Sequence, residues 1–164
     1  MSQTDTANRA AIEPSLDLER FLPYRLSLLS NTVSEGIAIA YRDVHGLSVT
    51  EWRVLAILGR FPDLTATDVM TRAAMDKVAV SRAVGRLDDK GLIRRTAQSE
   101  DRRRVALRLT RKGVRLFNAV VPEALAYEAR LLNLLTAKER SELDRLLGKL
   151  TSAAQSLGQD AETD

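Results

Sequence analysis

Residues 76–90 read DKVAVSRAVGRLDDK, and this stretch decides the fold. It predicts a helix, because Asp76 is a good N-cap whose carboxylate accepts hydrogen bonds from the free N–H groups of the first turn. One apolar stripe recurs at helical spacing, at Val80, Ala83, Val84 and Leu87. The opposite face is small, polar and basic, with Val78, Ala79, Ser81, Arg82, Gly85 and Arg86. Such a helix is either an ordinary solvated surface helix or one that inserts into a DNA major groove.

A shorter helix comes directly before this stretch. Thr65 and Asp68 form an N-terminal capping box, and the helix that they start covers about residues 66–71. Residues 72–75 then leave only a tight connection to Asp76. Two helices joined by so short a turn, the second with a polar outer face, predict a helix-turn-helix.

The spacing of apolar residues changes after Gly91 from a helical to a strand pattern. Residues 92–96 and 105–109 read as strands, and the second alternates apolar and other side chains. Between them lies AQSEDRRR (97–104), which is too polar to be buried. An arginine-tipped hairpin directly after a helix-turn-helix is a wing.

Basic charge is concentrated around these elements. Residues 72–112 hold 13 Lys or Arg against 5 Asp or Glu, a balance of +8, whereas the rest of the chain has a balance of −5. A focus of this kind is typical of a protein that binds a polyanion. A solvated basic face is the alternative, and the confinement of the charge to one supersecondary unit argues against it.

The composition excludes several classes of function. Without cysteine, disulfides, thiolate zinc sites and cysteine nucleophiles are excluded. One histidine, no clustered carboxylates and no Gly-rich phosphate loop leave no plausible catalytic constellation, so we expect no enzyme, no metal and no cofactor. No apolar run reaches the ~18 residues that cross a bilayer. The N-terminal residues also lack the apolar core of a signal peptide, so we expect a cytoplasmic protein without a membrane partner.

Long apolar helices flank the central region, at about residues 24–44 and 111–135, and a last helix follows the capping box of Thr136 and Glu139. The second of them is apolar nearly all round between Leu125 and Leu135, and such a helix must be buried on every side. We expect a second copy of the chain to cover it. The alternative is that the N- and C-terminal helices cover one another within one subunit.

Four segments resemble the MarR family of bacterial transcription regulators: MDKVAVSRAVGRL (75–87), KGLIRR (90–95), DRRR (101–104) and LTRKG (109–113). WRVL (52–55) and TAKE (136–139) also fit, and the resemblance covers about residues 21–150. It implies a mainly α fold with a small two-stranded β wing, that is, a winged helix-turn-helix with N- and C-terminal dimerisation helices. The expected units are a flexible N-terminal tail (1–14), dimerisation helices (15–46 and 114–155), a DNA-binding domain (47–113) and a flexible C-terminal tail (156–164).

The resemblance also implies a homodimer on a pseudo-palindromic DNA operator, with half-sites about 10 base pairs apart. On the recognition helix, Ser81 and Arg82 are our candidates for base edges, and Val78 for a thymine methyl group. The phosphate contacts are assigned to Arg72, Lys77 and Arg86, which set affinity but carry no sequence information. The remaining expected DNA-binding residues are Ala79 on the helix and, in the wing, Asp101, Arg102, Arg103 and Arg104. Asp101 would pair with a neighbouring arginine, and one of the three arginines would enter the minor groove, with the assignment left open.

A small organic effector is implied as well, an aromatic acid or its thioester, held in a cleft between the dimer helices and the DNA-binding lobe. The candidates are Arg25 as a carboxylate clamp, with Ser30, His45 and Trp52. Each has a simpler interpretation: an ion pair for Arg25, a helix-border hydroxyl for Ser30, a helix C-cap for His45 and a core anchor for Trp52. We therefore expect a repressor released by a ligand. The alternatives are a constitutive DNA-binding protein and a helical interaction protein without ligand control.

Overall fold

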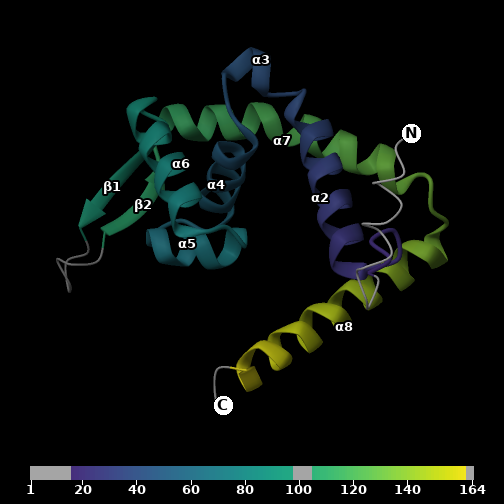
Figure 1. Cartoon of the computed structure of the whole chain (residues 1–164). Coiled ribbons are helices and arrows are strands. Elements are labelled where there is room, and N and C mark those ends of the chain that lie inside the picture. Colours follow the sequence, from purple (N-terminus) through teal and green to yellow (C-terminus); the bar gives the residue numbers. More distant parts are fainter. Residues whose placement is uncertain (1–15, 98–104, 162–164) are drawn as a thin grey trace, which may run out of the picture.

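The computed structural model describes residues 16–97 and 105–161. Its elements are α2 (Leu22–Ala38), α3 (Arg42–His45), α4 (Val49–Arg60), α5 (Ala66–Ala73), α6 (Lys77–Asp89), β1 (Ile93–Ala97), β2 (Val105–Leu109), α7 (Arg111–Leu132) and α8 (Ala137–Ala161). Two parts are visible in Figure 1. The winged domain holds α4, α5, α6, the hairpin and the first half of α7, and the helical arm holds α2, the second half of α7 and α8. The mainly helical fold with a two-stranded wing is thus confirmed.

The core lies inside the winged domain. The stripe of α6 supplies Val80, Ala83, Val84 and Leu87, each 3% exposed or less, as its periodicity predicts. They pack in one cluster with buried side chains of the other elements, namely Val54, Leu55 and Leu58 of α4, Val69 of α5, and Leu92, Ile93 and Leu107 of the hairpin region. Burial of one face of α6 leaves its other face free for contacts outside the domain.

Side-chain caps set the helix starts where the sequence places them. Asp76 accepts a hydrogen bond from the N–H of Ala79 at 2.9 Å, which starts α6. Reciprocal capping boxes are present at Ser48 with Glu51 and at Thr65 with Asp68. Each cap satisfies backbone donors that have no partner within the helix, so these boundaries are encoded locally.

The wing is an antiparallel hairpin in which Ile93 lies opposite Leu109. The N–H of Leu107 also donates to the carbonyl of Leu64 at 2.8 Å, which joins the hairpin to the α4–α5 turn. An ion pair between Arg108 and Asp63 strengthens the same connection. The hydrogen bond from Arg108 holds the pKa of the Asp63 carboxyl below its ordinary value. The wing tip, with the expected residues Asp101 to Arg104, lies outside the described residues.

Two sequence-based boundaries are wrong. The expected single helix over residues 24–44 ends at Ala38, and a turn separates it from α3. The break brings Tyr41, which is 0% exposed, into the core against the ring of Trp52, with 5.5 Å between ring centroids. At the other end of the chain, α8 continues to Ala161, so most of the expected tail from residue 156 is helical. The tail expected at residues 1–14 lies outside the described part.

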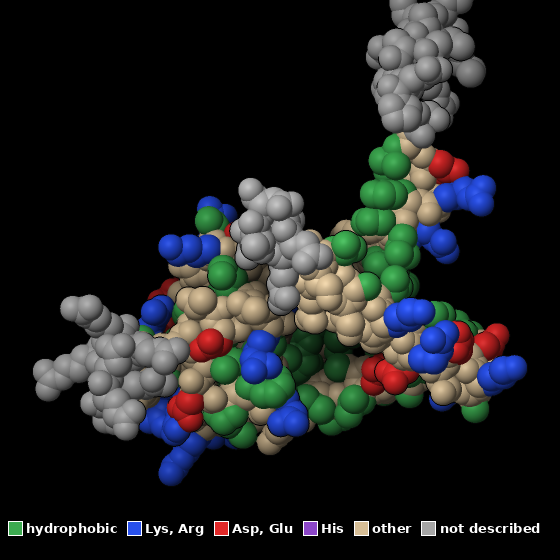
Figure 2. Space-filling model, turned by 90° about the horizontal axis from the view of Figure 1, so that it is seen from below, with side chains coloured by type: hydrophobic (Ala, Val, Ile, Leu, Met, Phe, Trp, Pro, Cys, Tyr) green, Lys and Arg blue, Asp and Glu red, His purple; other side chains and the backbone are tan. Residues whose placement is uncertain are grey.

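The helical arm exposes its apolar side chains. Every side chain of α8 that the structure describes, over residues 137–158, is exposed. Four of these are the leucine stripe Leu143, Leu146, Leu147 and Leu150. Seen from below, the surface is hollowed between the winged domain and the arm, and apolar side chains line the hollow (Figure 2). None of the described helices is both long and apolar enough to span a membrane.

Candidate nucleic-acid interface

The outer face of α6 carries the side chains that the sequence assigns to DNA. Lys77, Ser81, Arg82 and Arg86 are exposed, and Val78 is 57% exposed. Ala79 is half-buried at the edge of this face. The helix therefore presents short and basic groups outward, without a bulky side chain that would hold it away from another surface.

A groove of about 380 Å³ adjoins this face between the start of α5, α6 and β1. Lys77 and Ser81 line it together with Arg95, which the sequence analysis did not single out. Nε of Arg95 donates to Oδ2 of Asp88 at 2.9 Å, so the strand side chain is held against α6. The sequence has two arginines, Arg94 and Arg95, soon after α6, and only the structure shows that Arg95 is the one that lines the groove.

Arg72 is exposed at the end of α5, and its side chain is held by an aromatic ring. Its guanidinium lies 4.3 Å from the ring centroid of Phe61, and the guanidinium of Arg60 lies 5.0 Å from the same centroid. Stacking of this kind fixes a long side chain that would otherwise sample many rotamers. The sequence predicts Arg72 as a phosphate contact but does not reveal Phe61 as its support.

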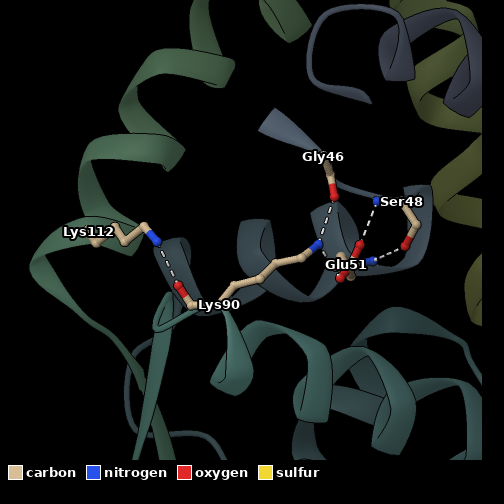
Figure 3. Close-up of polar contacts among 5 residues, drawn as sticks. All are labelled: Gly46, Ser48, Glu51, Lys90 and Lys112. Atoms are coloured by element: carbon tan, nitrogen blue, oxygen red, sulfur yellow. Dashed lines mark hydrogen bonds and ion pairs between the residues drawn. The ribbon is translucent and has the colours of Figure 1, made fainter. Parts of the chain in front are cut away.

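The C-terminal end of α6 is joined to α4 by one lysine (Figure 3). Nζ of Lys90 donates to Oε1 of Glu51 and to the carbonyl of Gly46, both at 2.7 Å. Glu51 is only 2% exposed, and its other oxygen accepts from the N–H of Ser48 at 2.7 Å. Burial raises the pKa of the Glu51 carboxyl, but the hydrogen bonds from Lys90 and Ser48 outweigh it and leave the pKa below its ordinary value.

The start of α7 holds the same end of α6 from the other side. Nζ of Lys112 donates to the carbonyl of Lys90 at 2.8 Å, and the hydroxyl of Thr110 donates to the carbonyl of Gly91 at 2.7 Å. At Gly113 a Cβ atom would lie 2.0 Å from the carbonyl oxygen of Leu92, so only glycine fits there. These contacts explain why threonine, lysine and glycine stand at positions 110, 112 and 113 of the segment LTRKG (109–113). The α3–α4 turn, through Gly46, and the start of α7, through Lys112, thus both contact Lys90 at the end of α6.

The four ligand candidates are not equally placed. Arg25 and Ser30 are exposed on α2, whereas His45 is half-buried at the end of α3 and lines a cleft. Trp52 is packed between the rings of Tyr41 and Phe117, with centroid distances of 5.5 and 6.2 Å, as a core anchor would be. Within the described residues, no group of three His, Cys, Asp or Glu side chains could hold a metal ion.

Comparison with known proteins agrees with this geometry. The model of the MarR family matches residues 45–104. The HTH-type transcriptional repressor MdtR of Bacillus subtilis is 33% identical over 110 residues, which cover 67% of this chain and 71% of that protein. Among solved structures, a MarR/EmrR family regulator from Acinetobacter has a TM-score of 0.78 and 29% identity, over 86% of this chain and 99% of that one. The repressor CouR, solved bound to a 23-mer DNA duplex, has a TM-score of 0.70 and 26% identity, over 82% of this chain and 95% of its own. The chain is a transcription regulator and belongs to the MarR family.

Proposed function

We propose that this regulator is a cytoplasmic homodimer that represses genes by binding a pseudo-palindromic operator, and that a small organic ligand releases it. The observation that carries the proposal is the division of α6 into two faces. Val80 and Leu87 are buried in the winged domain, while Ser81 and Arg82 are exposed beside a β-hairpin. A helix supported in this way can enter a major groove and offer its outer side chains to base edges.

The proposed roles follow from the chemistry of the side chains. Arg82 bonds bidentately to a guanine, Ser81 contacts a neighbouring base edge, and Val78 packs on a thymine methyl group. Lys77, Arg86 and Arg72 bind phosphates and fix the register of the helix. The wing arginines, residues 102–104, supply the contact to the flanking minor groove.

The exposed leucines of α8 support the dimer. Leu143, Leu146, Leu147 and Leu150 are 38–46% exposed and form one stripe on a helix whose described side chains are all exposed. Burying such a stripe against a second copy removes apolar surface from water. A two-fold dimer then places two copies of α6 in successive major grooves, with half-sites about 10 base pairs apart.

DNA binding is tested by fluorescence anisotropy on the DNA upstream of the chain's own gene and on a scrambled duplex of equal length. Arg82→Ala should lower the ratio of specific to nonspecific affinity by about 5- to 150-fold, the range expected for a lost bidentate base contact. Arg86→Ala, on the same helix, is the matched control and should weaken both duplexes alike. An equal loss on both duplexes for Arg82→Ala would overturn the assignment, and no binding to either duplex by the unaltered protein would favour the interaction-protein alternative.

Ligand control is tested on the same complex. Aromatic acids and their thioesters should release the operator at concentrations that leave nonspecific binding unchanged. If no compound in such a panel alters the affinity for the operator, the chain is a constitutive DNA-binding protein, which is the alternative to the proposal.

A further inference from the structure

The groove of about 380 Å³ beside the outer face of α6 combines apolar and cationic side chains. Its apolar lining includes Met70, Val80 and Val84, and its two cations are Lys77 of α6 and Arg95 of β1. No carboxylate is among its described lining residues. A nucleotide of a DNA strand has both complementary parts, because it joins a negatively charged phosphate to a less polar deoxyribose.

The guanidinium of Arg95 is held from one side and free on the other. Its Nε donates to Oδ2 of Asp88 at 2.9 Å, and this is the hydrogen bond that its side chain makes to a described residue. The guanidinium is planar, so fixing Nε also fixes the direction of the two terminal nitrogens, which carry four further donors. The side chains of Arg95 and Asp88 are 51% and 39% exposed, so a DNA strand can reach these donors.

The position of Arg95 distinguishes it from the neighbouring arginine. Arg94 and Arg95 follow one another in β1, and successive side chains of a strand point to opposite faces. Arg94 lines a different groove, next to Arg111 and Arg115 at the start of α7. Of the two strand arginines, Arg95 is the one among the described lining residues of the groove beside α6.

We propose that Arg95 is a phosphate clamp of the DNA-binding surface and that Asp88 is its positioning residue, so that an acidic side chain strengthens binding to a polyanion. The terminal nitrogens of Arg95 bind one DNA phosphate bidentately, and the ammonium of Lys77 adds a second charge to the same phosphate. The adjoining deoxyribose lies against Met70. This site adds a backbone contact to the proposed function and rests on it.

The effect of Asp88 on affinity has two opposing parts. Its carboxylate repels a phosphate, but the guanidinium of Arg95 lies between the two groups, and water and salt screen charges that are exposed. In return, Asp88 orders a long side chain before DNA arrives, and this ordering is worth about two- to tenfold in affinity. The preorganisation of Arg95 therefore outweighs the repulsion.

The first test is the fluorescence anisotropy of the full chain on the DNA upstream of its gene and on a scrambled duplex, over a range of salt concentrations. Arg95→Ala should weaken binding to both duplexes about tenfold. It should also reduce the slope of log affinity against log salt by about 0.9, the value for one phosphate contact. Arg94→Ala is the matched control, because it removes the same charge one residue away and should leave the slope unchanged.

The second test separates the orientation of Arg95 from the charge of Asp88. Asp88→Ala and Asp88→Asn remove the same negative charge, but the amide oxygen of asparagine still accepts from Nε of Arg95. We expect Asp88→Ala to weaken both duplexes about threefold without reducing the salt slope, and Asp88→Asn to bind at least as tightly as the parent protein. In an Arg95→Ala background the two variants should bind equally, because Asp88 acts through Arg95. Tighter binding by Asp88→Ala overturns the positioning role.

An unchanged salt slope in Arg95→Ala overturns the phosphate contact, and failure of the proposed function gives a different result. If the unaltered protein binds the two duplexes equally, the operator is rejected, but the slopes still test the clamp, because phosphate contacts also act on nonspecific DNA. If the protein binds neither duplex, the proposed function and the clamp are both rejected.

Discussion

Nζ of Lys90 lies 2.7 Å from Oε1 of Glu51, so the C-terminal end of α6 is held on the first turn of α4 by an ion pair whose carboxylate has almost no access to water. Glu51 contacts both helices. One carboxylate oxygen pairs with Lys90 at the end of α6, and the other accepts from the N–H of Ser48 in the capping box of α4. A carboxylate at this position also interacts favourably with the N-terminal dipole of α4. Lys90 therefore adds a polar contact to the buried apolar stripe that holds α6 in the winged domain.

Removing Lys90 should cost more stability than altering Glu51. Lys90→Met leaves the carboxylate of Glu51 buried without its cation, and we expect the free energy of unfolding to fall by about 3 kcal/mol, near the lower end for a broken buried pair because Lys90 is partly exposed. Glu51→Gln keeps an acceptor for the N–H of Ser48 and should cost about 1 kcal/mol. Urea unfolding followed by the fluorescence of Trp52, the single tryptophan, measures both. Equal losses in the two variants would contradict this account.

The same carboxylate makes stability depend on pH. The folded-state pKa of Glu51 is lowered from 4.5, so the unfolded chain binds its proton more readily. The stabilisation is therefore complete above pH 4.5 and is lost as the pH falls through the folded-state value. Asp63, Glu139 and Glu142 also have lowered pKa values and affect the parent protein and the variant alike. The difference in unfolding free energy between the parent protein and Glu51→Gln should accordingly shrink between pH 6 and pH 3.5, and a constant difference would argue against the ion pair.

The winged domain could be predicted because its determinants are local. Caps such as Asp76 and Thr65 mark helix starts within three residues of the groups that they satisfy. The stripe from Val80 to Leu87 identifies the buried face of α6, and with it the outer face that carries Ser81 and Arg82. Short-range rules of this kind can be read from one sequence without knowledge of the fold.

What could not be predicted depends on contacts between distant residues. The helical period continues through residues 39–41, and only the burial of Tyr41 against Trp52 explains the break there. Lys90 and Glu51 are 39 positions apart, and a lysine at a helix end carries no mark of its partner.

Tyr41→Phe should leave stability unchanged or raise it slightly. The hydroxyl of Tyr41 is buried and has no hydrogen-bond partner in the described part of the structure, and burial raises its pKa to about 12. Removing an unpaired polar group avoids its desolvation cost, for a gain of up to about 1 kcal/mol, while the ring contact with Trp52 is kept. Thermal unfolding tests this expectation. A loss above about 1 kcal/mol would show that the hydroxyl has a partner, such as a buried water.

Phe61→Leu should weaken DNA binding without changing its salt dependence. The ring stacks on Arg72 and orients it, a contact worth about 0.5–1 kcal/mol at an exposed site, so affinity should fall about two- to fivefold on every DNA sequence. The charge of Arg72 remains, so the slope of log affinity against log salt should stay the same. Arg72→Ala removes the charge and should reduce that slope by about 0.9. If Phe61→Leu reduces the slope as well, the ring does more than orient the arginine.

Leu146→Asp should convert the proposed dimer into a folded monomer. Leu146 is 41% exposed on α8, where no described side chain is buried, so the substitution removes no buried side chain from the described part of the chain. In a dimer that buries this stripe, the new carboxylate would lose its hydration without gaining a partner, and that cost opposes association. Sedimentation should give twice the 18.2 kDa chain mass for the parent protein and the single chain mass for the variant. Lys149→Ala, also exposed on α8, is the control and should remain dimeric. Because the proposed dimer would bind one operator with two copies of α6, the monomer should also lose most of its affinity for the operator while it keeps the nonspecific affinity of one winged domain. A Leu146→Asp protein that still sediments as a dimer would place the interface on other surfaces than α8.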